Sequence, residues 1–303
     1  MKICVLGAGA IGGFVGARMV NAGTDVTFID RGPMLEALKT KGFSVKSFLG
    51  DFAVKNLDAT DDFSVLKDAD IILLSVKSYS TEALAKQLKE VISKDAYVVS
   101  LQNGVENEDV LAKYLGAERV MGAVVYISCN MPELAEVNHT SMNKLIFGEM
   151  DGKTTPRIKT LCSLIEKAGF ETEISPCIKQ KLWGKLMMNA PFNGFTALIR
   201  GTMKNYHEVP EAKKCFLRTI KEVQTVAKAE GYELTEEDIQ KVIDFSNSEG
   251  FLNSKSSTLG DIEAGRPVEI DVLQGAVVKY AKKHNIDVPM NELIYSLIKM
   301  GLQ

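Results

Sequence analysis

Three polar side chains recur at intervals of four residues in an otherwise apolar stretch, at Lys185, Asn189 and Asn193. In a helix this spacing places all three on one face. Their neighbours are mainly large and apolar: Trp183, Leu186, Met187, Met188 and Phe192. Lysine is seldom buried without a role, so we expect this face to look into a cleft. For the two asparagines, hydrogen bonding between helices in a core is the alternative. Pro191 is expected to kink this helix or to end its first part.

A second polar cluster follows later in the chain. Ser257 and Asp261 are four residues apart, and Glu269 and Asp271 stand at a predicted helix start. Hydroxyl and carboxyl groups can bind a substrate or transfer a proton. Acids are also favoured at the start of a helix by its dipole. Helix capping is therefore as good an interpretation as catalysis for either acid alone.

The chain begins with a glycine-rich turn between two apolar runs, residues 3–6 and 26–29. The order strand, glycine turn, helix, strand is the dinucleotide-binding fingerprint. The first glycine permits a tight turn, the second lets a pyrophosphate approach the backbone, and the third lets the helix lie against the sheet. The alternative is a turn without a ligand. We expect the cofactor to contact Gly7, Gly9, Ala10, Ile11 and Gly12.

The end of the second apolar run decides which dinucleotide binds. An acid there usually bonds the adenine ribose and repels a 2′-phosphate, whereas an arginine can hold that phosphate. This chain has both, as Asp30 and Arg31. The two residues conflict, so the cofactor stays open at this point between NADP(H), with Arg31 as the phosphate ligand, and NAD, with Asp30 on the ribose. A solvated loop charge is the alternative for Arg31.

Two further polar residues follow buried parallel strands, predicted for residues 69–76 and 96–101. Lys77 comes after the first and Asn103, in an Asn-Gly pair, after the second. Ligands of open α/β sheets gather at the carboxyl ends of the strands. We therefore expect both to contact the cofactor, and Asn103 the substrate as well. An ordinary loop lysine and a plain turn are the alternatives.

These residues need two domains to position them. Strands and helices alternate up to residue 175, which predicts an N-terminal α/β domain with a Rossmann-type, doubly wound parallel sheet, including a hairpin at residues 43–54. From residue 176 to 303 the periodicity is helical, with breaks expected near Gly201, Gly231, Gly250, Gly265 and Pro289. We assign residues 1–175 to dinucleotide binding and 176–303 to an all-helical substrate and catalytic domain.

Composition excludes several other classes of protein. A net charge of −3 gives no electrostatic support for nucleic-acid binding. No apolar run is long enough to span a membrane. Residues 1–6 already form a strand, so no signal peptide is expected. The five cysteines include no CxxC pair, which favours reduced thiols in the cytoplasm. The three histidines lack metal-ligand spacing, so no metal is expected.

Together these motifs resemble the ketopantoate reductase (2-dehydropantoate 2-reductase) family over essentially the whole chain. The resemblance rests on the GAGAIGG turn, Ser75-Val76-Lys77, Gln102-Asn103-Gly104, the Lys185-x3-Asn189-x3-Asn193 helix, Ser256-Ser257 with Asp261, and Gly265-Arg266-x2-Glu269-Ile270-Asp271. Thr258, where an apolar Met is common, and Pro191 depart from the family pattern.

The resemblance implies reduction of 2-ketopantoate to (R)-pantoate by NADPH, on the route to pantothenate and coenzyme A. It implies that Lys185 is the general acid and that Glu269 supports it. It further implies that Ser257 holds the substrate carboxylate, that Asn189 and Asn193 bond its oxygens, and that Lys77 and Asn103 lie by the nicotinamide. Relatives of this fold use NAD to make other D-2-hydroxy acids, and Asp30 and Thr258 leave that alternative open.

A dinucleotide sensor without catalysis is the remote alternative. It predicts a degraded second-domain site, but Lys185 and Glu269 are both present. Beyond the small 2-keto acid, a homodimer through helices of the second domain is compatible with the sequence, although no sequence feature indicates it.

Overall fold

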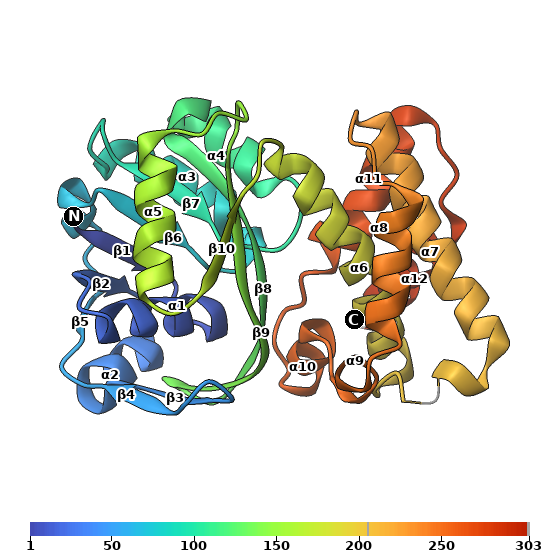
Figure 1. Ribbon diagram of the computed structural model, residues 1–303, viewed down its shortest axis with the longest axis horizontal. Helices are drawn as coiled ribbons and strands as arrows, with labels where there is room; N and C mark the ends of the chain where they lie inside the picture. Colours follow the sequence, from blue (N-terminus) through green and yellow to red (C-terminus); the bar gives the residue numbers. More distant parts are fainter. Residues whose placement is uncertain (205, 302–303) are drawn as a thin grey trace. The chain divides into compact units, whose positions relative to one another are not determined.

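The computed structural model describes residues 1–204 and 206–301, which divide into two compact units (Figure 1). The first comprises Met1–Gln102 and Asn107–Ile178. The second comprises Asn103–Glu106 and the chain from Lys179 onward. The short Asn-Gly segment therefore groups with the helices and not with the strand that it follows.

The first unit is built on a ten-stranded sheet in the order β4-β3-β9-β8-β7-β6-β1-β2-β5, with β10 paired to β9. Strands β8, β7, β6, β1, β2 and β5 are parallel neighbours. Its strands are β1 (Ile3–Leu6), β2 (Val26–Ile29), β3 (Phe43–Ser47), β4 (Phe52–Val54), β5 (Asp58–Thr60), β6 (Ile71–Leu74), β7 (Tyr97–Ser100), β8 (Val120–Glu133), β9 (Glu136–Glu149) and β10 (Glu171–Ile174).

This architecture confirms the Rossmann-type fold expected from the sequence, and the hairpin of β3 and β4 is present as well. One detail differs, because the sheet is mixed beyond its parallel part: β9 runs antiparallel to β8. Only Leu134 and Ala135 connect these two strands. So short a connection can join antiparallel strands only, since a parallel return needs a long crossover.

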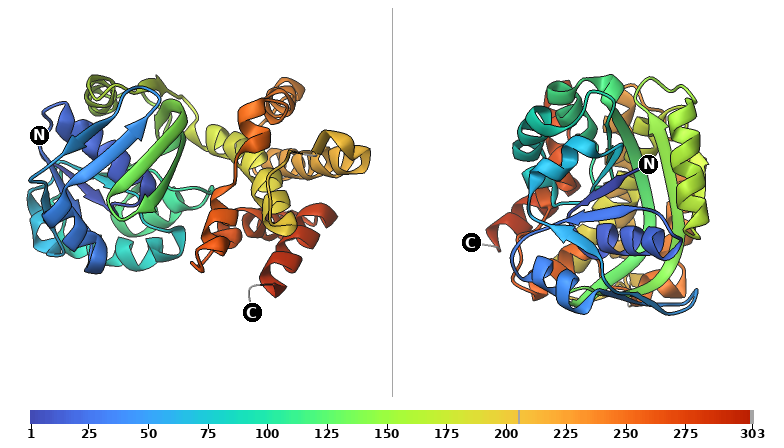
Figure 2. Two further views of the ribbon diagram at one scale, coloured as in Figure 1. Left: turned by 90° about the horizontal axis from the view of Figure 1, so that it is seen from below. Right: turned by 90° about the vertical axis from the view of Figure 1, so that its left-hand side faces the viewer.

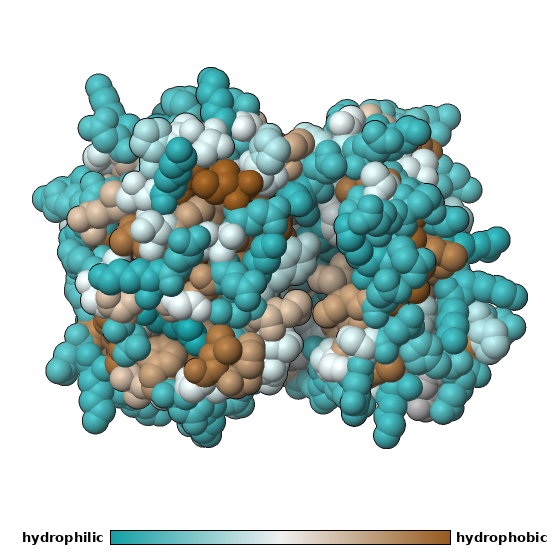
Figure 3. Space-filling view, viewed as in Figure 1, coloured by the Kyte–Doolittle hydropathy of each residue, from teal (hydrophilic) through white to brown (hydrophobic). Residues whose placement is uncertain are grey.

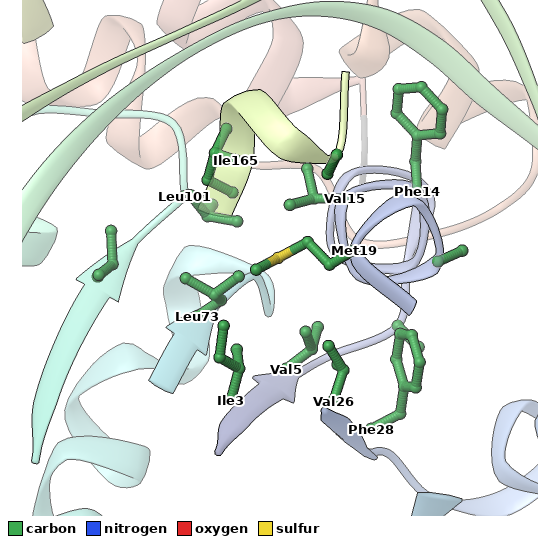
Figure 4. Close-up of a cluster of buried hydrophobic side chains, with 14 of the residues drawn as sticks. Ile3, Val5, Phe14, Val15, Met19, Val26, Phe28, Leu73, Leu101 and Ile165 are labelled. Atoms are coloured by element: carbon green, nitrogen blue, oxygen red, sulfur yellow. The ribbon is translucent and has the colours of Figure 1, made fainter. Parts of the chain in front are cut away.

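Helices cover both faces of the sheet: α1 (Ala10–Asn21), α2 (Gly32–Lys41), α3 (Thr81–Val91), α4 (Asn107–Leu115) and α5 (Pro156–Lys167). Figure 2 shows α5 on the opposite side of the strands from α3 and α4. Side chains alternate accordingly, since Ile3 and Val5 belong to the core under α1 and α5, and Cys4 and Leu6 to the core under α3 and α4. In Figure 4, Met19 of α1 points toward the strands.

The second unit is helical throughout the part that the structure describes, as expected. Its elements are α6 (Ile178–Ile199), α7 (Pro210–Ala229), α8 (Glu236–Ser246), α9 (Glu249–Asn253), α10 (Ser257–Glu263), α11 (Gln274–His284) and α12 (Pro289–Met300), with 3₁₀ turns at Tyr206–Glu208 and Ile270–Val272. The chain breaks as expected after α6, at Gly231 and Gly265, and before Pro289.

The break expected near Gly250 is present at residues 247–248, between α8 and α9, whereas the helix end expected at Pro191 is wrong. Helix α6 continues through Pro191 to Ile199, and Gly250 lies inside α9. Around Pro191, Ala190 and Asn193 are buried, so packing holds the helix despite the missing N–H group. Gly250 is tolerated because Ser248 caps α9 and Phe251 anchors it in the core.

Helix α6 is fixed against α11 and α12 by close packing. A Cβ atom at Gly194 would lie 2.5 Å from Ile294 and 2.6 Å from the amide nitrogen of Gln274, so glycine lets the helices approach closely. Trp183, almost fully buried, stacks edge-on against Tyr280 with ring centroids 5.5 Å apart. These contacts set the rotation of α6 and therefore the direction of its polar face.

The surface in Figure 3 is mainly hydrophilic, with apolar side chains gathered in small patches. Three large exposed apolar residues lie on α12: Leu293, Leu297 and Met300. In the described part of the chain, no helix is long and apolar enough to cross a membrane. All five cysteines are free thiols.

Candidate active site

The glycine turn connects β1 to α1 with little space to spare. Gly7 has a φ of +95°, and its N–H donates to Ile29 O at 3.0 Å. A Cβ atom at Gly7 would lie 2.9 Å from a methyl group of Val76, and one at Gly12 would overlap Gly7 O. Both glycines are therefore required by the chain's own packing, in keeping with the tasks assigned to them from the sequence.

Gly9 is different, because among the described residues outside its immediate chain neighbours no atom lies within 4 Å of the position that its Cβ would occupy. Its φ of −65° is one that any residue adopts. Neither strain nor internal packing explains this glycine, so the open space suits a group from outside the chain. Ala10 and Ile11 begin α1 here, and no side chain caps its first turn. Uncapped N–H groups at a helix start suit a pyrophosphate, so the turn fits a dinucleotide.

Asp30 turns its carboxylate back onto the glycine turn. Its Oδ2 accepts a hydrogen bond from Ala8 N at 2.7 Å, and its Oδ1 accepts one from Arg31 N at 2.8 Å. Arg31 is the N-terminal flanking residue of α2, and its side chain is exposed. It has no carboxylate within ion-pair distance among the residues that the structure describes. Its guanidinium group is therefore available to an external anion at a helix start.

Lys77 follows β6 and is partly buried. The segment that carries it is fixed by Gln102, whose amide donates to Val76 O at 2.8 Å and to Thr81 Oγ1 at 2.9 Å. Thr81 in turn donates to Asn107 Oδ1 at 3.0 Å. This buried chain ties the end of β6 to the starts of α3 and α4, so it positions the backbone at Lys77.

Sequence reasoning did not assign a role to Gln102, although it lies beside Asn103 in the family motif. The available signal was a large polar residue directly after a buried strand. Asn103 itself lies in a turn, followed by Gly104 with a φ of +104°. The turn is anchored to the helical unit because Lys179 Nζ donates to Val105 O at 2.8 Å.

Lys185 lies on α6 and is partly buried. Protein surrounds its ammonium group, and this burial lowers the pKa of Lys185 from 10.5 to about 8, against the opposing effect of the Glu269 carboxylate. Its Nζ atom has no hydrogen-bond partner among the described residues. The sequence separated these two residues into different polar clusters, and the fold brings them close enough to interact electrostatically.

Glu269 and Asp271 have different surroundings. Glu269 precedes the 3₁₀ turn at Ile270–Val272, and its side chain does not cap that turn. Asp271 Oδ1 accepts hydrogen bonds from Tyr295 Oη at 2.6 Å and Lys299 Nζ at 2.8 Å, which fastens the turn to α12. Helix capping therefore does not explain Glu269, whereas Asp271 has a structural role.

The two asparagines of α6 also differ. The Asn189 carboxamide is partly exposed and has no hydrogen-bond partner within the described chain. Asn193 is 3% exposed, and its amide nitrogen donates to Asn189 O at 2.9 Å. Its Oδ1 accepts from Ser257 Oγ at 3.2 Å and from the backbone and side chain of Thr258. The structure thus brings Asn193 and Ser257 together at the start of α10.

The sheet and its glycine turn place this chain in the Rossmann-type class of folds that bind dinucleotides. The model of the family Ketopantoate reductase PanE/ApbA matches residues 3–152, and that of its C-terminal domain matches residues 177–303. The chain therefore belongs to the ketopantoate reductase family. In the described residues, no group of three His, Cys, Asp or Glu side chains could hold a metal ion.

Individual relatives agree with this assignment. A 2-dehydropantoate 2-reductase from Archaeoglobus fulgidus is 34% identical, with 98% of this chain and 97% of the relative covered. The crystal structure of 2-dehydropantoate 2-reductase from Geobacter metallireducens has a TM-score of 0.93 at 28% identity, covering 99% of this chain and 100% of that one.

The same fold occurs in an enzyme with another substrate. A ternary structure of D-mandelate dehydrogenase with NADH and anilino(oxo)acetate has a TM-score of 0.91, covering 99% of this chain and 98% of that one. Its sequence identity is 23%, so this likeness concerns the fold alone.

Proposed function

We propose that the protein reduces 2-dehydropantoate to (R)-pantoate with NADPH, on the route to pantothenate and coenzyme A. The observation that carries this proposal is the environment of Lys185, a largely desolvated ammonium group that Glu269 helps to keep charged. Reduction of a ketone creates an alkoxide, which needs both a proton and a nearby positive charge. Family membership and the 2-dehydropantoate 2-reductases among its relatives support the choice of substrate.

In this mechanism each residue has one task. The bound reduced nicotinamide supplies the hydride. Lys185 Nζ donates a proton to the developing alkoxide, a general-acid step worth about 10²–10⁴-fold in rate. Glu269 keeps Lys185 charged and oriented. Asn189 offers its carboxamide to the substrate oxygens, and Ser257 donates to the substrate carboxylate.

The remaining assigned residues hold the cofactor or, in one case, a neighbouring side chain. Gly7, Gly9, Ala10, Ile11 and Gly12 form the pyrophosphate turn, and Lys77 and Asn103 are proposed to lie at the nicotinamide end. Asn193, proposed from the sequence as a substrate ligand, has its carboxamide engaged within the protein, so it acts on the substrate through Ser257. On this proposal residues 1–175 bind the dinucleotide and residues 176–303 bind the keto acid.

Arg31 supports NADPH as the physiological reductant. It is exposed at the start of α2, where a phosphate is also favoured by the helix dipole. The carboxylate of Asp30 already accepts two backbone N–H groups. We expect kcat/KM to be higher with NADPH than with NADH, and Arg31→Ala to lower the NADPH value at least about tenfold while leaving the NADH value nearly unchanged. A wild-type preference for NADH would instead indicate that Asp30 selects the cofactor by bonding the adenine ribose.

The proposed reaction is tested with Lys185→Ala and the matched control Lys181→Ala, an exposed lysine one turn earlier on the same helix. Both are assayed by NADPH oxidation with 2-dehydropantoate and with simpler 2-keto acids. Lys185→Ala should lose about 10²-fold or more in kcat and keep its NADPH affinity, and the control should resemble wild type. Normal turnover by Lys185→Ala would contradict the proposed general acid.

The second candidate function is an NAD-linked D-2-hydroxyacid dehydrogenase, favoured by the presence of Asp30. It predicts better turnover of a simpler 2-keto acid with NADH in the same screen. A dinucleotide sensor predicts binding without turnover of any keto acid.

We also propose that two copies of the chain associate through the outer face of α12. Leu293 and Leu297 are exposed there, one helical turn apart.

A further inference from the structure

Five polar residues join the start of α10 to α6. Four of them are almost fully buried: Asn193 and Thr196 on α6, and Ser256 and Thr258 at the start of α10. Thr196 Oγ1 and Ser256 Oγ are hydrogen-bonded at 2.6 Å, and Ser256 also caps the helix by accepting from Leu259 N. The fifth residue, Ser257, is exposed. It is therefore the member of this group that a substrate can reach.

Asn193 lies at the centre of this group with a defined orientation. Its amide nitrogen must face Asn189 O, because a carbonyl oxygen only accepts hydrogen bonds. Its Oδ1 therefore faces α10, where three donors meet it: Ser257 Oγ at 3.2 Å, Thr258 N at 3.2 Å and Thr258 Oγ1 at 2.9 Å. An amide oxygen has two lone pairs, so one of these three donors is in excess.

The excess donor is Ser257. Both donors of Thr258 are buried and have no competing acceptor in solvent, whereas the Ser257 hydroxyl is exposed. A carboxylate that arrives at α10 can take the Ser257 proton as a hydrogen bond, and Asn193 Oδ1 then keeps two donors. Without the Thr258 hydroxyl, turning the Ser257 hydroxyl toward the substrate would leave the buried Asn193 Oδ1 with one hydrogen-bond donor. Leaving a buried oxygen short of a hydrogen bond is unfavourable.

We propose that Thr258 is a positioning residue that satisfies Asn193 and thereby releases the Ser257 hydroxyl to bind the carboxylate of the 2-keto acid. This inference rests on the proposed function, because it assumes a carboxylate substrate at Ser257. It gives Thr258 a role that neither its position nor its apolar counterpart in the family pattern indicated.

The test is a double-mutant cycle with Thr258→Val and Ser257→Ala. Valine keeps the shape of threonine and removes the hydroxyl. We expect Thr258→Val to raise KM for the keto acid about three- to tenfold, with kcat and NADPH affinity unchanged. In the Ser257→Ala background the same substitution should have no further effect on KM, since it acts through Ser257. Thr258→Ser should behave as wild type.

Each other outcome has a definite meaning. An unchanged KM in Thr258→Val would overturn the role of Thr258. An equal rise in KM with and without Ser257 would also overturn it, because the effect would then be a general distortion of α10. If Thr258→Val does not fold, Thr258→Ala is compared with Thr258→Ser in the same cycle. A wild-type protein that reduces no 2-keto acid would instead overturn the proposed function.

Discussion

At Lys185, burial and a neighbouring carboxylate act on the pKa in opposite directions. Burial prevails and lowers the pKa to about 8, and Glu269 limits the fall. A general acid must be protonated to act. The rate of keto-acid reduction should therefore hold below pH 8 and decline as the pH rises through about 8. In the reverse oxidation the same group must accept a proton, so that rate should increase over the same range.

The effect of Glu269 on the pKa of Lys185 predicts how the pH dependence of kcat/KM changes in Glu269→Gln. Removing the carboxylate removes the influence that raises the pKa of Lys185, so the decline in kcat/KM should begin at lower pH than in wild type. The matched control is Glu263→Gln, an exposed acid at the end of α10 that pairs with Lys255. Its pH profile should match wild type. A profile of Glu269→Gln displaced to higher pH would contradict the assigned electrostatic role.

At the scale of single elements, alanine substitutions at Gly12 and Gly9 of the glycine turn should have different effects on stability and on cofactor affinity. Gly12→Ala would push a methyl group into Gly7 O, so the turn must open. Overpacking of this kind costs about 1–3 kcal/mol, and both thermal stability and cofactor affinity should fall. The methyl group of Gly9→Ala meets no non-neighbouring atom of the described chain within 4 Å, and the backbone conformation at this position suits alanine. Its melting temperature should equal that of wild type, while the Kd for NADPH rises about tenfold or more.

Thermal denaturation and fluorescence titration with NADPH separate these two cases. Normal affinity in Gly9→Ala would show that the open space beside Gly9 is not used by the cofactor. The same comparison with NADH distinguishes a pyrophosphate effect, which both dinucleotides share, from an effect on the 2′-phosphate.

Elements fixed by local sequence were predictable, and partnerships between distant residues were not. The turn from β1 to α1 follows from glycine spacing, and the hairpin predicted for residues 43–54 is present as β3 and β4. The continuation of α6 through Pro191 depends on tertiary packing, which a local rule for proline omits. The polar face of α6 was foreseen as a row of three residues. Their separate environments depend on Glu269 and Thr258, which reach α6 only in the folded chain.

At the scale of the whole molecule, α12 has two apolar faces. Ile294 and Ile298 pack with Ala197 in the core of the helical unit. Leu293, Leu297 and Met300 recur at intervals of four and three residues and are exposed. On the proposal made above, this row is the surface through which two copies of the chain associate. Two copies related by a twofold axis would each cover the row of the other, because such an interface uses the same surface twice.

Light scattering during gel filtration tests this interface. The wild-type protein should have twice the 33.2 kDa mass of one chain. The double variant Leu293→Lys/Leu297→Lys would place charges in the interface, so it should have the mass of one chain with an unchanged melting temperature. The control is Leu134→Lys, an exposed leucine between β8 and β9, which should remain dimeric. A monomeric wild type at assay concentration, or a double variant that stays dimeric, would contradict the proposal that the chain associates through α12.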